Sequence, residues 1–122
     1  MYVRTIKFKN FYGNTIEREF TFNLNQAQLL ELEVESGGSV RKLITDVIEK
    51  NKPEDVINFV KTIVKASYGV ISDDGLYFDK TEEVWNRFYM SNAYDKLFME
   101  LINSEEELVR FISETIPNAE DI

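Results

Sequence analysis

The densest group of potential ligands in the sequence is Ser72–Gly75, which reads Ser-Asp-Asp-Gly, with Asp79 four residues after the glycine. Several oxygen donors around a tight glycine turn suit a hard cation such as Ca²⁺. An EF-hand loop, however, has alternating acidic positions before its glycine and a bidentate glutamate about six residues after it. Here Leu76, Tyr77 and Phe78 follow the glycine directly. The pattern therefore predicts a turn with solvated carboxylates.

Other catalytic chemistry lacks its usual side chains. The chain has no histidine and no cysteine, so the commonest general base and the usual zinc, iron and copper ligands are missing. Paired carboxylates could hydrolyse glycosides, but that chemistry also needs a sugar-binding cleft. No Lys-Ser or Lys-Thr pair directly follows Gly37 and Gly38, which therefore predict a flexible joint rather than a nucleotide-binding loop. We expect a protein without catalytic activity, metal or cofactor.

The carboxylates also set the charge of the chain, which is −8 at pH 7. Binding to phosphate backbones depends on Lys and Arg displacing counterions, so we expect no nucleic-acid partner. Residues 1–72 carry 9 acidic and 10 basic side chains, whereas residues 73–122 carry 13 acidic and 4 basic ones. This polarity could orient copies head to tail, steer a basic partner toward the C-terminal half, or serve solubility alone.

Aromatic residues are dense in the C-terminal half, and aromatic side chains on a surface are favoured anchors for protein partners. Trp85, Phe88 and Tyr89, together with Met90, cover nearly half the circumference of one predicted helix, so some apolar surface should remain exposed. We predict that one set of aromatic residues forms core and partner-binding groove together, although the pattern does not separate the two roles. The set is Phe78, Trp85, Phe88, Tyr89, Tyr94, Phe98 and Phe111.

Residues 1–24 are predicted to form an antiparallel β-hairpin. From Thr15 to Leu24 apolar and polar residues alternate, as in a half-buried strand. Tyr2–Lys9 is rich in β-branched and aromatic residues, and Asn10–Asn14 supplies the Gly and Asn that tight turns use. A lone hairpin is only marginally stable in water. Its apolar face must therefore pack on the helices that follow, or its edge must pair with another strand, within the chain or in a homo-oligomer.

Residues 25–66 predict three helices. Asn25 can cap the first, which runs to the break at Ser36–Gly38. Ser39 can cap the second, whose apolar residues follow the i, i+3, i+4, i+7 spacing of an amphipathic helix. Pro53 suits the first turn of the third, which is the most apolar of the three and is expected at the centre.

Residues 67–80 interrupt the helical pattern, and their Asp-Asp-Gly turn predicts either a short second hairpin or an ordered loop. Residues 81–116 predict further helices, with a break or kink near Ser91 and the spacing of a capping box at Ser104–Glu107. The acidic tail, residues 117–122, should fray.

The order of these elements predicts a single α+β domain over residues 1–122: an N-terminal antiparallel β-hairpin followed by a mainly α-helical bundle of about five to six helices. The length fits one domain. No apolar run approaches the roughly 18 residues that a membrane span needs. The lack of cysteine is typical of a reducing compartment. We expect a soluble intracellular protein without a membrane partner.

A series of short motifs runs through residues 67–117. In chain order the motifs are Ser67-Tyr68-Gly69, Asp74-Gly75, Phe78, Ala93-Tyr94-Asp95-Lys96-Leu97-Phe98-Met99-Glu100-Leu101, Phe111-Ile112 and Ile116-Pro117. This ordered series resembles the tail assembly chaperones of long-tailed, siphovirus-like bacteriophages and prophages. Before residue 67 the strand and helix patterns fit the family, but no motif matches.

The resemblance implies a non-structural, non-catalytic helper protein. Such a chaperone would bind the long, aggregation-prone tape measure protein and keep it soluble until tail tube subunits polymerise around it. It would act in the host cytoplasm and be absent from the mature virion, and it could form a homo-oligomer. The tail tube protein is a further expected contact.

Three other interpretations remain open at the level of the sequence. One is another tail or neck component, such as a tail terminator or connector-like ring protein, which also uses an exposed hairpin to join subunits. Another is an acidic inhibitor that mimics nucleic acid, which the charge of residues 73–122 favours and the many aromatic residues oppose. The third is an enzyme with a deep carboxylate-lined pocket, which no spacing in the sequence predicts.

Overall fold

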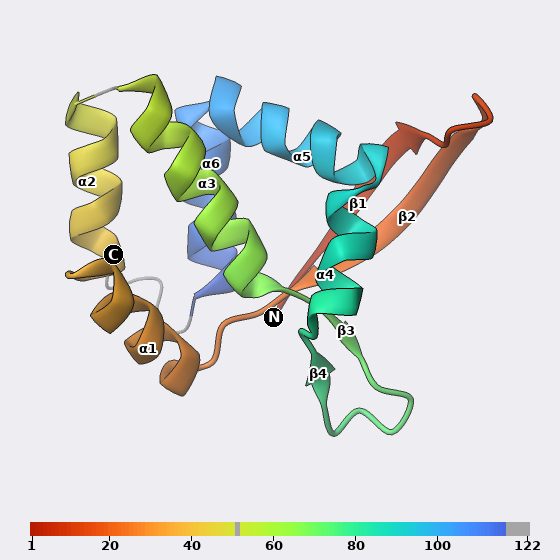
Figure 1. The fold of residues 1–122 in the computed structure, drawn as a ribbon, viewed down its shortest axis with the longest axis horizontal. Helices are drawn as coiled ribbons and strands as arrows, with labels where there is room; N and C mark the ends of the chain where they lie inside the picture. Colours follow the sequence, from red (N-terminus) through yellow and green to blue (C-terminus); the bar gives the residue numbers. More distant parts are fainter. Residues whose placement is uncertain (51, 117–122) are drawn as a thin grey trace.

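The computed structural model describes residues 1–50 and 52–116. Two strands come first and helices dominate the rest, so the predicted α+β class is confirmed (Figure 1). The described residues form six helices and four strands. The fraying predicted for residues 117–122 concerns a segment outside the described residues.

The predicted N-terminal hairpin consists of β1 (Tyr2–Lys9) and β2 (Thr15–Phe22), paired antiparallel along their whole length. The Asn10 side chain shapes the turn between them by accepting the backbone N–H groups of Tyr12 and Asn14 at 3.0 and 2.9 Å. Gly13 adopts a φ of 86°, which costs a glycine little. Figure 1 shows the β1–β2 hairpin extending beyond the helices, so its turn lies at the end of a projection.

The three helices predicted in residues 25–66 are α1 (Gln26–Ser36), α2 (Val40–Lys50) and α3 (Pro53–Ser67). At the start of α1, the Asn25 side chain accepts the Gln28 N–H and the Gln28 side chain accepts the Asn25 N–H, which is a complete capping box. All three predicted helix starts are confirmed. The third helix lies centrally, between α2 and α5 and in front of α6 (Figure 1).

The segment 67–80 forms a second hairpin rather than a loop. Strand β3 (Tyr68–Ile71) continues directly from α3, and β4 (Phe78–Asp79) pairs with it antiparallel. The start of β3 also pairs with the end of β2, through Thr21↔Gly69 and Phe22↔Tyr68. The four strands therefore make one sheet of order β1-β2-β3-β4, and the N-terminal hairpin gains a partner strand within the chain.

The C-terminal helices are α4 (Glu82–Tyr89), α5 (Asn92–Asn103) and α6 (Glu105–Thr115). The predicted break near Ser91 separates α4 from α5, and the Ser91 hydroxyl accepts the first-turn N–H of Tyr94. The capping box predicted at Ser104–Glu107 is only half formed. The Ser104 hydroxyl accepts the Glu107 N–H at 3.2 Å, but the Glu107 carboxylate turns to arginines instead.

The core lies where the sheet meets the helices. Phe22, at the end of β2, is fully buried and contacts residues from several elements. Helices α3, α5 and α6 each contribute fully buried aliphatic side chains to the same cluster, namely Val60, Ile63, Val64, Leu97, Leu101 and Ile112.

Over the part of the chain that the structure describes, none of the helices combines the length and hydrophobicity that crossing a membrane requires.

Candidate partner-binding surface

Four of the seven aromatic residues predicted for core and groove are buried. They are Trp85, Phe88, Tyr94 and Phe111. The Phe88 ring stacks on Tyr68 with a centroid distance of 4.2 Å, and Phe111 meets Phe22 edge to face at 5.0 Å. Burial of the Tyr94 phenol raises its pKa to about 12. These four side chains serve the core and are not available to a partner in this conformation.

The other three predicted residues do not form one surface. Phe78 on β4 and Phe98 on α5 are half-buried, whereas Tyr89 at the end of α4 is exposed. The Lys61 ammonium lies 4.9 Å from the Tyr89 ring centroid, so this ring already has a cation over it. The partner-binding role of the seven residues stays a prediction, and their placement directs attention to other apolar side chains.

Met90, just after α4, is 66% exposed, and six other strongly exposed large apolar residues lie in pairs on three parts of the chain. The hairpin tip between β1 and β2 carries Phe11 and Tyr12, and Tyr12 is 92% exposed. The loop of the β3–β4 hairpin carries Leu76 and Tyr77. The outer face of α1 carries Leu30 and Val34, which are 64% and 82% exposed. Sequence reasoning missed all three.

Signals for these positions were present in the sequence. Phe11 and Tyr12 sit inside an Asn- and Gly-containing turn, where no core can form around them. On α1, Leu29 and Leu32 lie on one side and Leu30 with Val34 on the other. An 11-residue helix with apolar residues on both sides needs cover on both sides.

The β3–β4 loop is held by its own polar side chains. The Asp74 carboxylate accepts the Ser72 hydroxyl at 2.6 Å and the Leu76 N–H at 3.0 Å, and these bonds hold the pKa of Asp74 below its ordinary value. Gly75 takes a φ of 75°. The predicted turn with solvated acids is therefore what the segment forms, and its rigidity presents Leu76 and Tyr77 to solvent.

The base of this hairpin depends on a close approach that only glycine allows. A Cβ built on Gly69 would lie 2.5 Å from the Phe78 ring. Ser67, two residues earlier, is fully buried, and its hydroxyl donates to the Ile63 carbonyl at 2.7 Å. The Ser-Tyr-Gly motif thus joins α3 to the sheet, and its members act on the fold rather than on a ligand.

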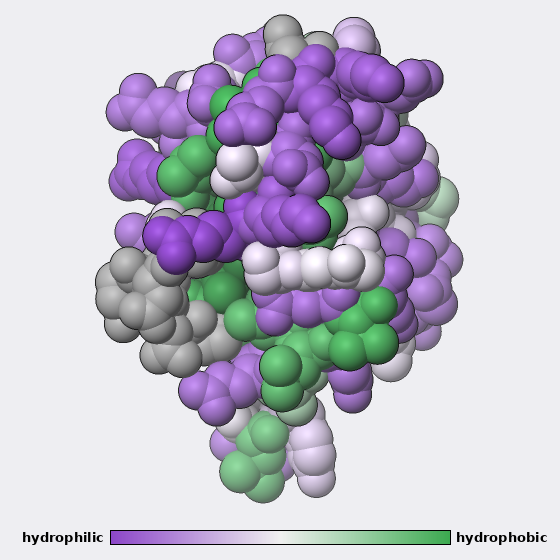
Figure 2. Space-filling model, turned by 90° about the vertical axis from the view of Figure 1, so that its left-hand side faces the viewer, coloured by the Kyte–Doolittle hydropathy of each residue, from purple (hydrophilic) through white to green (hydrophobic). Residues whose placement is uncertain are grey.

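Helix α1 is attached to the body by half-buried Leu29 and Leu32, which pack against the core, and by polar contacts. The Glu33 carboxylate accepts the Val40 N–H at 2.7 Å, which ties α1 to α2. The Lys80 ammonium donates to the Gln28 side chain at 3.0 Å. Figure 2 shows the side of the molecule that carries α1 and α2, where apolar side chains interrupt the polar surface at the level of α1.

Lys80 joins four elements at the junction of α1, β2, α3 and β4. Its ammonium also donates to the backbone carbonyls of Asn23 and Ala66, at 2.5 and 2.8 Å. Burial lowers the pKa of Lys80 to about 8. A buried lysine with a lowered pKa can mark a catalytic site. Here all three contacts are to structural oxygens, so the group acts as a clamp.

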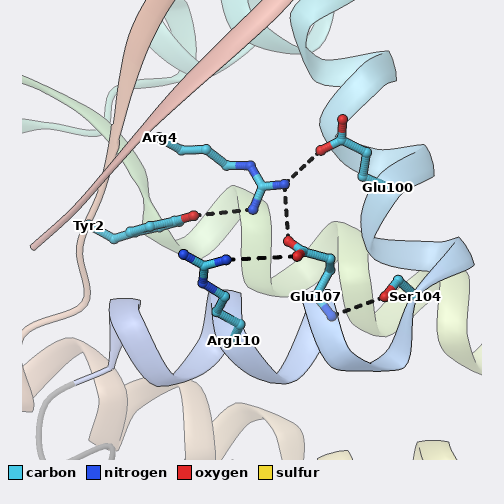
Figure 3. A network of polar contacts seen from close by, with 6 residues as sticks. All are labelled: Tyr2, Arg4, Glu100, Ser104, Glu107 and Arg110. Carbon is cyan, nitrogen blue, oxygen red and sulfur yellow. Dashed lines mark hydrogen bonds and ion pairs between the residues drawn. The ribbon is translucent and has the colours of Figure 1, made fainter.

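A second polar cluster ties β1 to the last two helices (Figure 3). The Arg4 guanidinium lies 2.6 Å from the Glu100 carboxylate and 3.4 Å from that of Glu107. It also donates to the Tyr2 hydroxyl at 3.2 Å. Arg110 approaches Glu107 from the same helix at 3.9 Å. These contacts occupy the Glu107 carboxylate, which explains why the capping box is incomplete.

The exposed apolar side chains are the candidate surfaces for contact with a protein partner. Within residues 1–50 and 52–116, no group of three or more acidic residues is placed to hold a metal ion. The hollow between α2 and α3 has a volume of about 300 Å³ and is open to solvent. It mixes the apolar Leu43, Val47 and Phe59 with the acidic Asp46 and Asp55.

Comparisons with known proteins address the family directly. A search of curated proteins and a search of solved structures each find no match. The model of one protein family, described as phage tail assembly chaperone, matches residues 1–120. The match therefore includes β1, β2 and the first three helices, where the sequence showed no recognisable motif. The chain belongs to the phage tail assembly chaperone family.

Proposed function

We propose that this chain binds the tape measure protein of its phage tail and keeps it soluble during tail assembly, without catalysing a reaction. Membership of the tail assembly chaperone family carries this proposal. The exposed apolar side chains on the hairpin tip, the β3–β4 loop and α1 support it, because a chaperone must contact apolar segments of its client.

The distribution of these side chains suits a contact that must later be released. They lie on three separate projections instead of one large patch, so each can contribute only a modest part of the binding free energy. The net charge of −8 keeps the protein and its complex in solution. Tail tube subunits could therefore displace the chaperone as they assemble around the client.

Co-expression with the tape measure protein of the same tail tests the proposal. We expect an otherwise insoluble client to appear in the soluble fraction and to co-purify with the chain. Size-exclusion chromatography with light scattering then gives the stoichiometry. An insoluble client beside a free ring of this chain would contradict the proposal and favour a tail terminator or connector-like role.

The same proposal places the chain in the host cytoplasm and outside the mature virion. Mass spectrometry of purified particles provides the measurement. Peptides of this chain should be present in the infected-cell lysate and absent from the particles. Stoichiometric amounts in the particle would make it a structural component instead.

A further inference from the structure

Helix α1 has an apolar outer face that nothing in the described chain covers. Leu30 and Val34 lie one turn apart on this face and are 64% and 82% exposed. Leu29 and Leu32, on the inner side, are only half-buried. None of the eleven residues of α1, all of them described, is fully buried. A helix that is apolar on both sides is normally enclosed on both sides.

The charges on the same helix restrict what can cover this face. Glu31 and Glu35 follow Leu30 and Val34 directly, so two exposed carboxylates one turn apart border the two apolar side chains. Gln26–Ser36 contains no lysine or arginine that could neutralise them. Glu33 differs, because its carboxylate is already engaged by the Val40 N–H.

A second copy of α1 is a poor occupant of this face. Two such helices packed together would bring Glu31 and Glu35 of one copy close to those of the other, and like charges at a contact oppose association. A partner helix with apolar residues four apart, bordered by Lys or Arg, would match both the apolar side chains and the carboxylates of this face. Its apolar side chains would cover Leu30 and Val34, and its cations would meet the carboxylates.

We propose that the outer face of α1, made of Leu30, Glu31, Val34 and Glu35, docks a basic amphipathic helix of the client. The inference rests on the proposed function, because it takes the tape measure protein as the source of that helix. A three-turn helix spans roughly 16 Å, so each α1 covers a short segment of a long client. The contact is correspondingly weak and easily displaced.

The contacts that hold α1 in place do not use the side chains of its outer face. The capping box of Asn25 and Gln28 begins the helix, and Gly37, with a φ of 77°, ends it. The Lys80 ammonium holds the first turn of α1 by donating to the Gln28 side chain. None of these contacts involves the side chain of Leu30 or Val34, so we expect substitutions of these side chains to leave the fold intact.

Two variants of the full chain test the docking site. Leu30→Ser combined with Val34→Ser removes the apolar seam, and Glu31→Lys combined with Glu35→Lys reverses the charge. The matched control is Glu49→Lys with Glu114→Lys, which changes the net charge equally at exposed positions near the ends of α2 and α6. Lysine is favourable near a helix C-terminus, so the control should fold normally. Circular dichroism melts confirm folding for all three.

The binding probes are two labelled synthetic helical peptides of about three turns each. Both carry leucines four residues apart on one face. One peptide has lysines on either side of these leucines, and the other has glutamates. Fluorescence anisotropy should show that the wild-type chain binds the lysine peptide at least about tenfold more tightly than the glutamate peptide. The serine variant should lose this binding. The charge-reversed variant should prefer the glutamate peptide, and the control should behave as wild type. Equal binding of both peptides by the wild type would overturn the proposal.

Client solubility separates this inference from the proposed function. If the wild-type chain solubilises the tape measure protein and both α1 variants do so equally well, the docking site is wrong while the chaperone role stands. If the wild-type chain leaves the client insoluble, the proposed function itself fails. Loss of solubilisation in the two α1 variants, with activity retained in the control, supports both.

Discussion

The surroundings of Phe22 and those of Leu30 differ sharply, although the two residues lie only eight positions apart. Phe22 ends β2, is fully buried and meets the rings of Tyr68, Phe88 and Phe111. Leu30 lies on the outer side of α1, a helix without a fully buried residue, and is 64% exposed. Both are large apolar residues, so apolar character alone does not decide burial. The comparison separates side chains that stabilise the fold from side chains left for a partner.

The largest effect expected from this comparison is at the aromatic cluster. Phe22→Ala removes a fully buried ring that meets aromatic rings from four elements, namely β1, β3, α4 and α6, and leaves a cavity in the core. We expect the free energy of unfolding to fall by about 3–5 kcal/mol. Urea denaturation followed by tryptophan fluorescence of Trp85 measures the change.

The counterpart, Leu30→Ala, should change the free energy of unfolding by no more than about 0.5 kcal/mol. The side chain is mostly solvated in the folded state, so little burial is lost. A loss comparable with that of Phe22→Ala would place α1 in the cooperative core and remove the basis for the docking proposal.

A second large effect is expected where β3 and β4 approach. Gly69→Ala would push a methyl group against the Phe78 ring, whose nearest atom would lie at 2.5 Å. Overpacking of this kind costs about 1–3 kcal/mol. Thermal unfolding measures it. Gly38→Ala is the matched control, because its Cβ meets only the Lys42 side chain, at 3.9 Å. The control should be as stable as the wild type or slightly more so.

The secondary structure was predictable where a local rule governs it. Alternation of apolar and polar residues, interrupted only at Arg18, indicated β2. Asn25, Ser39 and Pro53 indicated the starts of α1, α2 and α3, because capping depends on neighbouring residues alone. The partner of Glu107 was not predictable in this way. Arg4 lies 103 positions earlier in the chain, and only the packing of β1 against α5 and α6 brings them together.

The candidate surface was predictable only in part. Density of aromatic residues indicated an apolar cluster, but the pairing of β3 with β2 brings Tyr68 against Phe88 and closes the cluster from the sheet side. Tyr68 covers Phe88 and Tyr94 meets Trp85 edge to face, so both rings are buried. Tyr89 and Met90, at the end of the same helix, stay exposed, and further exposed apolar residues lie on turns and on the second side of α1, outside any single apolar stripe.

Loss of the ion pairs that Arg4 of β1 makes should lower the free energy of unfolding by a moderate amount. Arg4→Met removes the contacts to Glu100 and Glu107 that join β1 to α5 and α6. Because the Arg4 side chain is only 13% exposed, we expect a loss of about 1–2 kcal/mol in the free energy of unfolding, measured by urea denaturation. Arg87→Met breaks a pair whose two side chains are more than 70% exposed, and should cost no more than about 0.5 kcal/mol.

The last prediction is a dependence of stability on pH and concerns Lys80, which connects α1 to the core and so joins the two regions compared above. Its pKa is about 8 in the folded chain, lowered by burial from an ordinary value of 10.5. Between these two pH values the unfolded chain binds more protons at this site, so its contribution to stability rises as pH increases through the window. Below pH 8 the half-buried ammonium stays charged in the folded chain, and its desolvation opposes folding. Lys80→Met lacks this titration. The difference in unfolding free energy between wild type and variant should therefore increase from pH 8 to 10.5, measured by urea denaturation at each pH. A constant difference would show that the three oxygens around the ammonium offset its burial, and that the link between α1 and the core does not respond to pH.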